Sequence, residues 1–372
     1  MAIDALKPAR LTPRQPFRRA AVRGLGWSCA LLLAAGAALG AGQRQADVLD
    51  VPTPLRATFA RATVTGIAAS GSTLIAVGPR GIILRSTDSG AQWQQVAAPV
   101  SADLTSVRFF GADTAWVVGH DSVILKSVDR GATWTRVLDG RVLFKTMQQA
   151  AQGDAVLAKE VARTMGQSAT ADVWPAALLD LMFLDDKRGF AIGAFGLLLA
   201  TTDGGQTWLP WMANADNERQ FHLYAINGDG PRPYIAGEQG LVLRLDEAGK
   251  RFGRVVTPYN GTYFGVDAVG ARVLVYGLRG NVYLSDDAGA AWRRLDTVTD
   301  ANVVSGGLLP GGLWLATQTG EMLAGQFPAA KLGVAATAPG PDLFGAVAVG
   351  PGRYAVARLN GVAKIEVQPA AK

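Results

Sequence analysis

The sequence predicts an all-β fold, a seven-bladed β-propeller of four-stranded blades with a helical insert between blades two and three. Three observations favour this fold. The 372 residues include 45 glycines and are only 18% charged, which suits a turn-rich β protein better than long helices or disorder. A motif of the form S/T-x-D-x-G-x-x-W recurs four times along the chain. A four-residue turn recurs seven times, once for each expected blade.

Residues 1–42 show the order of charge and apolarity that marks an export segment. Six basic residues precede an apolar run over residues 25–42. This run is either part of a cleaved signal peptide or, at about 18 apolar residues, an uncleaved membrane anchor at the lower limit of length. Cys29 lies two residues after the bulky Trp27, so we expect no lipid attachment there. The chain is expected to be exported, periplasmic and membrane-associated, with residues 43–54 as a linker to a propeller at 55–372.

Charge and composition exclude several classes of function. Outside residues 1–42 the chain carries 30 basic and 29 acidic residues, so it lacks the broad positive surface of a nucleic-acid-binding protein. One cysteine and two histidines, His120 and His222, make a cysteine-based zinc site or a histidine-rich metal centre improbable. We expect no cofactor and no bound metal.

The first blade supplies the template for the others. Its expected strands are Thr65–Ala69, Leu74–Val77, Ile82–Ser86 and Trp93–Ala97, from the channel outwards. The later blades are expected to start near Leu104, Leu179, His222, Phe264, Asn302 and Leu343.

The recurring motif follows the third strand of four blades. Its aspartate can accept turn N–H groups, its glycine allows a left-handed backbone, and its tryptophan can pack between neighbouring sheets. The motif resembles the Asp-box, the repeat of bacterial neuraminidases that marks β-propellers. We therefore expect its aspartates and tryptophans to be structural and none to be catalytic: Asp88, Trp93, Asp129, Trp134, Asp203, Trp208, Asp287 and Trp292.

The recurring turn joins the second and third strands of each blade, and its copies are expected to surround one end of the central channel, called the mouth below. They begin at Gly78, Gly119, Gly193, Gly237, Gly277, Thr317 and Arg358. Variable turn residues are the natural place for binding. The candidate partner-binding residues are Arg80, Arg279, Arg358, His120, Glu238 and Gln239, with Asp121 and Phe195 on the same surface. The arginines suit carboxylates or acidic segments, and the alternative is that they are merely solvated.

One segment interrupts the repeat. About 33 extra residues, 141–177, separate the second and third motifs, and residues 148–165 have a helix-forming composition with Leu157, Val161 and Met165 on one face. Strand parity places this insert on the same side of the propeller as the mouth. Its apolar face either packs on the rim of the propeller or meets a partner.

The ends of the propeller are expected to pair with each other. The last blade stops after its third strand at Val367, and residues 55–63 (LRATFARAT) are expected to supply the missing outer strand. Such closure would remove an exposed sheet edge.

These features together resemble the photosystem II assembly and stability factor family. The resemblance rests on seven blades, an export segment, the G-x-R-G turns at 78–81 and 277–280, and the T-D-G-G-Q-T-W sequence at 202–208, and it covers about 55–367. It implies a non-enzymatic, membrane-peripheral propeller that binds a newly made membrane protein through arginines. Arg80 and Arg279 match those positions best, and Arg358 is the weaker match. For relatives in non-photosynthetic bacteria, the resemblance suggests an accessory role beside an exporter of the resistance-nodulation-division type.

The leading hypothesis is a monomeric, exported scaffold that binds an envelope membrane protein and aids its assembly or stability. The runner-up is a glycoside hydrolase, since many Asp-box propellers are sialidases, which use arginines and a tyrosine nucleophile. Candidate tyrosines are Tyr224, Tyr259, Tyr263 and Tyr354, but the first-blade Arg-Ile-Pro sequence of sialidases is missing. A passive glycan or peptide binder is a third possibility.

Overall fold

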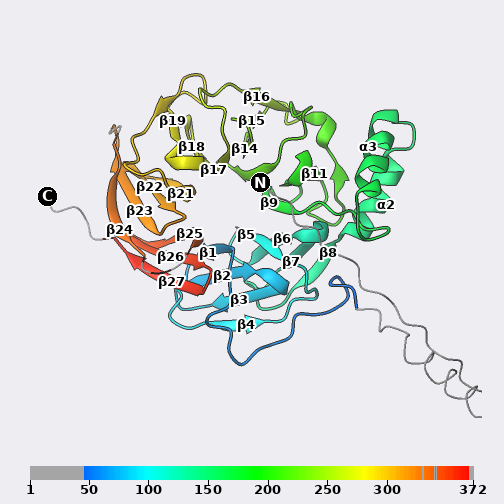
Figure 1. Ribbon diagram of the computed structural model, residues 1–372, viewed down its shortest axis with the longest axis horizontal. Coiled ribbons are helices and arrows are strands. Elements are labelled where there is room, and N and C mark those ends of the chain that lie inside the picture. Colours follow the sequence, from blue (N-terminus) through cyan, green and yellow to red (C-terminus); the bar gives the residue numbers. More distant parts are fainter. Residues whose placement is uncertain (1–45, 329–330, 339, 341, 368–372) are drawn as a thin grey trace, which may run out of the picture. The chain divides into compact units, whose positions relative to one another are not determined.

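The structure is a computed structural model, and it describes residues 46–328, 331–338, 340 and 342–367. Seven antiparallel sheets are arranged in a ring around a central channel (Figure 1). The inner strand of each sheet contacts the inner strand of the next, and the seventh contacts the first. The predicted seven-bladed propeller is confirmed. The predicted export segment lies outside the described residues.

Six of the seven sheets have four strands, ordered from the channel outwards. Blades one to three comprise β1 (Gly66–Ser70), β2 (Thr73–Gly78), β3 (Ile82–Ser86), β4 (Gln94–Val96); β5 (Leu104–Phe110), β6 (Thr114–Gly119), β7 (Ile124–Ser127), β8 (Thr135–Leu138); and β9 (Leu178–Phe183), β10 (Gly189–Gly193), β11 (Leu198–Thr201), β12 (Leu209–Pro210).

Blades four to seven continue the same order. They comprise β13 (Leu223–Asn227), β14 (Tyr234–Gly237), β15 (Val242–Leu245), β16 (Phe252–Val255); β17 (Tyr263–Val269), β18 (Arg272–Gly277), β19 (Val282–Ser285), β20 (Arg293–Arg294); β21 (Val303–Leu309), β22 (Gly312–Thr317), β23 (Glu321–Gln326), β24 (Gly333–Thr337); and β25 (Leu343–Gly350), β26 (Arg353–Arg358), β27 (Gly361–Glu366). Each inner strand of blades two to seven begins within one residue of its predicted start.

The core lies between the blades rather than inside any one of them. Every residue of β2 is buried, because both faces of this strand are covered by neighbouring sheets. Trp116 of blade two stacks on Phe183 of blade three, with 4.6 Å between ring centroids. Trp208 meets the same pair edge-on and is 2% exposed. Aromatic packing of this kind binds each blade to its neighbour.

The Asp-boxes close the turns between the third and fourth strands. In the second copy, Ser127 Oγ donates to Asp129 Oδ1 at 2.7 Å, and the Gly131 N–H donates to Ser127 Oγ at 2.8 Å. Thr133 donates to Asp129 through both its N–H and its hydroxyl. The same Ser/Thr–Asp bond recurs in the other three copies. These aspartates are therefore occupied by their own turns, which agrees with a structural role.

The predicted closure of the propeller is wrong. Residues 55–63 form no strand, and the seventh sheet has three strands in the part of the chain that the structure describes. The segment instead lies beside the seventh blade: Phe59 and Ala62 pack into the cluster that joins blades seven and one. Backbone pairing begins only at Val64, whose N–H donates to the Arg358 carbonyl at 3.1 Å. The missing outer strand of the last blade favoured this segment as its replacement, but the segment packs through apolar side chains without a ladder.

Residues 47–53, expected to be part of a linker, are held against blades one and two. Leu49 is 1% exposed, and Thr53 Oγ1 lies 2.7 Å from the Val100 carbonyl oxygen and 2.8 Å from that of Gly81. Asp47 and Asp50 both pair with Arg141, at 2.5 and 2.8 Å. This segment forms a strap between the first mouth turn and the helical insert.

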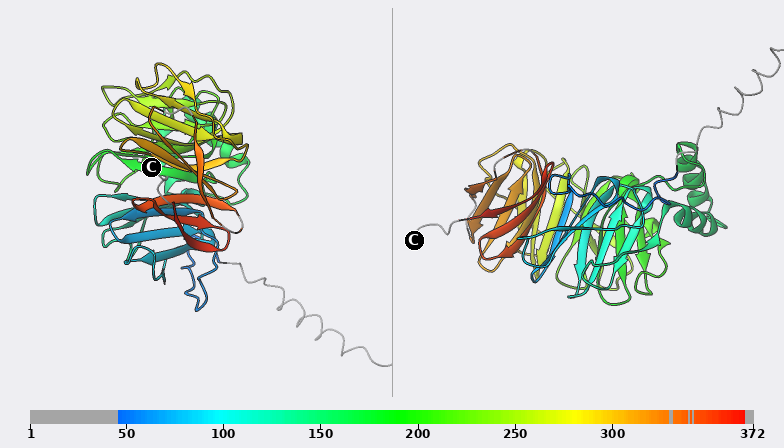
Figure 2. Two further views of the ribbon diagram at one scale, coloured as in Figure 1. Left: turned by 90° about the vertical axis from the view of Figure 1, so that its left-hand side faces the viewer. Right: turned by 90° about the horizontal axis from the view of Figure 1, so that it is seen from below.

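The insert is a pair of helices, α2 (Gly140–Ala150) and α3 (Ala155–Gly166), rather than the single helix predicted over 148–165. Asp139 and Asp154 cap the two helices by accepting backbone N–H groups of the first turn. Leu143 and Met147 of α2 are fully buried against blades two and three. On the predicted face of 148–165, Val161 is buried in the same cluster and Met165 packs against it, so this part of the face packs on the rim, whereas Leu157 also borders an open cavity. Figure 2 shows the pair standing at the outer edge of the ring.

No helix in the described ranges is both long and apolar enough to cross a membrane.

Candidate partner-binding site

The mouth turns have a common geometry that explains their two glycines. In blade one, a Cβ on Gly78 would lie 2.3 Å from the Thr63 carbonyl oxygen, just before the inner strand of the same blade. A Cβ on Gly81 would lie 2.2 Å from the Val100 carbonyl oxygen, in the connection to the next blade. Gly81 also has a φ of 72°, in the left-handed region that favours glycine. The turn is therefore held between two backbone segments.

The third residue of the turn is exposed in four of the first five blades, and in blade two it is the half-buried Asp121. Its φ is positive in the first five blades, at 59° for Arg80 and 55° for Arg279. The Arg80 N–H donates to Asp103 Oδ1 at 2.7 Å, and the Arg279 N–H donates to Asn302 Oδ1 at 3.0 Å. Both residues are exposed. The next blade thus fixes the backbone of each arginine and leaves its side chain at the surface.

Neither guanidinium makes a hydrogen bond or an ion pair with another residue in the described ranges. Arg80 belongs to blade one and Arg279 to blade five, which are not neighbours in the ring (Figure 1). They are therefore separate cationic points at the mouth and do not form one compact cluster. Both remain available to carboxylates of a partner.

Arg358 does not belong to this exposed set. It is the last residue of β26 and is 5% exposed, with its guanidinium against Gly340. Its turn begins with an arginine where the regular turns have their first glycine, so Arg358 occupies the inward-facing first position and not the third. The expectation that it presents a charge at the mouth is wrong.

The remaining predicted residues divide into two kinds. His120 and Gln239 are exposed in their turns. Glu238 is half-buried, and its Oε2 accepts the His222 N–H at 2.8 Å. Glu238 is therefore engaged by the backbone of its own blade, whereas His120 and Gln239 can meet a partner.

Asp121, which follows His120, is half-buried and near other carboxylates. Burial raises its pKa, and Asp47 and Asp103 act in the same direction, while His120 opposes them. The mouth near blade two is thus locally acidic in contrast to the arginine positions.

The channel contains a charged network that no sequence motif predicts. Arg108 of blade two makes a bidentate contact with Asp180 of blade three, at 2.8 and 2.6 Å, and Asp180 is 2% exposed. Asp180 Oδ2 also accepts the Ile226 N–H of blade four at 3.0 Å. The Asp180 charge raises the pKa of Arg108. The partners are 72 residues apart in sequence, so no local motif could identify them.

A second carboxylate continues this network. Asp267 of blade five accepts the Asn227 amide of blade four at 2.9 Å and the Leu308 N–H of blade six at 2.7 Å. Burial raises the pKa of Asp267. The channel volume is about 570 Å³, and its polar groups mainly connect the inner strands to one another.

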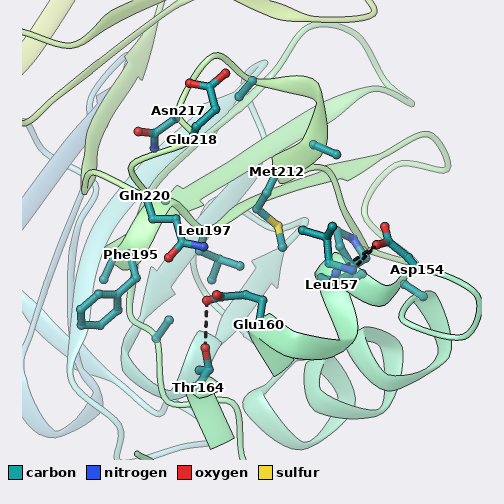
Figure 3. A pocket seen from close by; sticks show the side chains of 18 of the residues that line it. Asp154, Leu157, Glu160, Thr164, Phe195, Leu197, Met212, Asn217, Glu218 and Gln220 are labelled. Atoms are coloured by element: carbon teal, nitrogen blue, oxygen red, sulfur yellow. Dashed lines mark hydrogen bonds between the residues drawn. The ribbon is translucent and has the colours of Figure 1, made fainter. Parts of the chain in front are cut away.

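A separate cavity of about 560 Å³, called the groove below, lies between the insert and blade three (Figure 3). Leu157 and Glu160 of α3 line one side, and Phe195 and Leu197 of blade three line the other. Met212 lies in the segment after β12 and also faces the cavity. The groove was not predicted, because the insert was expected to form one helix.

An aromatic series connects the groove with the channel. The ring centroids of Phe195 and His222 lie 4.8 Å apart, and those of Tyr224 and Phe264 lie 5.6 Å apart. His222 and Tyr224, at 6.2 Å, join the two pairs. Burial raises the pKa of Tyr224, and the nearby Glu238 adds to this effect. A raised pKa disfavours the tyrosinate character expected of a nucleophile.

Within the described residues, no three His, Cys, Asp or Glu side chains come together in a way that could hold a metal ion.

Comparison with known proteins identifies similar chains. A model of the family described as "Photosynthesis system II assembly factor YCF48" matches residues 64–166 and 160–312. The photosystem II assembly lipoprotein Ycf48 of Synechococcus sp. (strain CC9902) is 30% identical over 126 residues, 33% of this chain and 37% of that protein. The chloroplastic photosystem II stability/assembly factor HCF136 of Arabidopsis thaliana is 34% identical over 82 residues, 21% of this chain and 20% of that protein. The alignments thus span little more than a third of the first of these relatives and a fifth of the second.

A solved structure described as YCF48 bound to D1 peptide has the same fold, with a TM-score of 0.60. The match covers 86% of this chain and 96% of that one, at 14% identity.

Proposed function

The chain belongs to the family of the photosynthesis system II assembly factor YCF48, and we infer from this that it is a non-enzymatic assembly scaffold for a membrane protein. The family match over most of the propeller carries this proposal. The solved relative described as bound to a D1 peptide supports a peptide segment of a membrane protein as the ligand. The partner here is a photosystem II subunit or another envelope membrane protein.

The mouth is the proposed contact. Arg80 and Arg279 supply exposed cations on a fixed backbone, and His120 and Gln239 add polar contacts between them. Such positions suit carboxylates on a partner segment, since a guanidinium can bind a carboxylate through two parallel hydrogen bonds. The rigid ring keeps these groups in place without a partner, which reduces the entropy lost on binding.

The test is affinity purification of the tagged protein from gently solubilised membranes. We expect a membrane protein to co-purify in stoichiometric amount and to be lost when Arg80→Glu and Arg279→Glu are combined. The matched control combines Lys187→Glu and Lys250→Glu, which reverse two exposed charges in turns at the opposite end of the blades. This control should retain the partner.

Retention of the partner in the double arginine variant would remove the mouth from the mechanism. Equal loss in both variants would show that net charge, and not the mouth, governs association. If no membrane protein co-purifies, the scaffold proposal fails, and panels of glycans and of aryl glycosides then separate a passive binder from a hydrolase.

We also infer that the protein is exported and stays close to the membrane through residues 25–42. The relative in Synechococcus is named a lipoprotein, which supports a membrane-associated location. Cell fractionation combined with N-terminal sequencing of the mature chain tests this. A mature chain that begins before residue 25 indicates an anchor, one that begins near residue 43 indicates a cleaved signal, and recovery from the cytosol contradicts export.

A further inference from the structure

The groove beside α3 is open and apolar at its centre. Leu157, Leu197 and Met212 face the cavity from three different segments (Figure 3). Two large apolar side chains at its edges are unusually exposed, Val156 at 82% and Phe195 at 60%. A cavity of about 560 Å³ flanked by exposed apolar groups has the size and lining of a ligand-binding site.

Phe195 lies at a turn position where the fold requires a left-handed backbone but does not require a phenylalanine. Its φ is 57°, in the left-handed region, which is costly for a bulky residue. The equivalent positions of blades one, two, four and five hold Arg80, Asp121, Gln239 and Arg279, so polar residues suit this turn. The ring meets His222 edge-on, with 4.8 Å between centroids, but stays mostly exposed, so packing within the chain compensates only part of this cost. A contact with a ligand would account for the phenylalanine.

The charge around the groove is negative. Asp154, Glu160 and Glu218 line it together with Arg251, which pairs with Asp216. Glu160 is paired as well, with Arg163 at 2.6 Å, and this contact lowers the pKa of Glu160. In contrast, Asp154 and Glu218 have no ion pair with any residue that the structure describes. They lie on different sides of the apolar centre (Figure 3).

We propose that the groove binds a peptide segment of a partner protein in which a large apolar side chain is flanked by lysine or arginine. The apolar side chain fills the space between Leu157 and Met212 and covers Phe195. The cations lie near Asp154 and Glu218, where their charge is complementary. Gln220 at the edge can offer its amide N–H groups to the backbone of the peptide, while its Oε1 accepts from Arg163 at 3.0 Å. Asn217 is held by the Phe221 backbone through both ends of its amide.

This site goes beyond the mouth proposed above and has the opposite charge preference. The mouth arginines select acidic groups, whereas the groove selects basic ones. A partner segment with acidic groups at one end and basic groups at the other would bind in a single direction across the propeller, because the mouth takes the acidic end and the groove takes the basic end.

The experiment uses the purified protein and three fluorescein-labelled peptides with a Leu-Phe centre flanked on both sides by lysine, serine or glutamate. Binding is measured by fluorescence anisotropy at low and at high salt. We expect saturable binding, with the lysine peptide at least about tenfold tighter than the glutamate peptide and weaker at high salt.

Two variants locate the site. Glu218→Lys should weaken binding of the lysine peptide by about tenfold, whereas Asp186→Lys, which reverses an exposed charge in a turn at the opposite end of blade three, should leave it unchanged. Phe195→Asn should abolish binding without lowering the melting temperature, because asparagine tolerates a left-handed backbone.

Three results would overturn the proposal: no saturable binding of any peptide, equal affinity for all three, or binding that Glu218→Lys and Phe195→Asn leave intact. The variant with Arg80→Glu and Arg279→Glu should bind the lysine peptide normally. The groove and the mouth can therefore fail independently.

Discussion

At the scale of single residues, the channel is held together by side chains that cross from one inner strand to the next. Thr65 Oγ1 donates to the Leu104 carbonyl, and Thr105 Oγ1 donates to the Leu178 carbonyl, at 2.9 and 2.6 Å. Asp180 continues the series with an ion pair. Because Asp180 is buried, its contacts are little screened by water.

Asp180→Ala should lower the free energy of unfolding by about 2 kcal/mol, because it leaves the Ile226 N–H and the partly exposed Arg108 cation without their acceptor. Ser305→Ala is the matched control. It removes one neutral bond, to the Ala346 carbonyl, and should cost about 1 kcal/mol. Urea denaturation measures both, and equal losses would show that the channel ion pair adds nothing.

The Asp-box predicts a specific dependence on pH. The Thr133 hydroxyl and the turn N–H groups lower the pKa of Asp129 to about 2, from 3.8. The stabilisation from the ionised carboxylate is therefore complete above about pH 4 and is lost as the pH falls towards 2. The difference in unfolding free energy between the protein and Asp129→Asn should follow this course. Asp186→Asn, at an exposed carboxylate with no hydrogen bond to another residue that the structure describes, is the matched control.

At the scale of elements, turn chemistry made the strands predictable. The paired glycines of the mouth turns and the Asp-boxes mark both ends of the third strand, so strand positions followed directly. The insert is less predictable, because the apolar spacing over 148–165 does not show where one helix ends and the next begins. Asp154 begins α3 and therefore ends any continuous helix across it.

The packing of α2 can be tested with two neighbouring residues. Leu143→Ala should cost about 3 kcal/mol of unfolding free energy, since Leu143 is fully buried and the change leaves a cavity. Val142→Ala, at a residue that is half exposed, should cost much less. Similar values for the two variants in thermal and urea unfolding would contradict rim packing.

The candidate site was only partly predictable for a related reason. Arg80 and Arg279 were identified because they occupy the third position of regular turns. The turn of blade seven lacks the first glycine and has Arg358 in that place. The residue type alone therefore does not show that Arg358 occupies the buried first position and not the exposed third position. The groove depends on α3 meeting blade three, a contact between segments with no shared motif.

At the scale of the whole molecule, the last blade has three strands within the described residues, and the ring closes where β25 contacts β1. In the described structure β27 has a partner only in β26, whereas β23 lies between β22 and β24. The outward amides of β27 should therefore exchange hydrogen faster than those of β23. Hydrogen exchange with mass spectrometry measures this. Equal protection in the two strands would mean that another segment covers β27.

The strap formed by residues 47–53 adds a further constraint. It joins the first mouth turn to α2, because Thr53 donates to the Arg80 carbonyl and Asp47 and Asp50 pair with Arg141. A substitution in the insert or at Arg80 can therefore alter the contacts of the same segment. Arg141→Ala should loosen the strap at Asp47 and Asp50, while Leu49 stays buried, and should make this segment more susceptible to limited proteolysis. Val142→Ala is the neighbouring control and should leave the cleavage rate unchanged.

The construction of the mouth turns has a consequence for how such a protein diversifies. Glycines and backbone bonds determine the path of each turn, and the third side chain contributes almost nothing to it. Arginine, aspartate, phenylalanine and glutamine already occupy this position on one scaffold. Selection can therefore change these residues one at a time, and a lineage can acquire a new partner while its propeller stays the same.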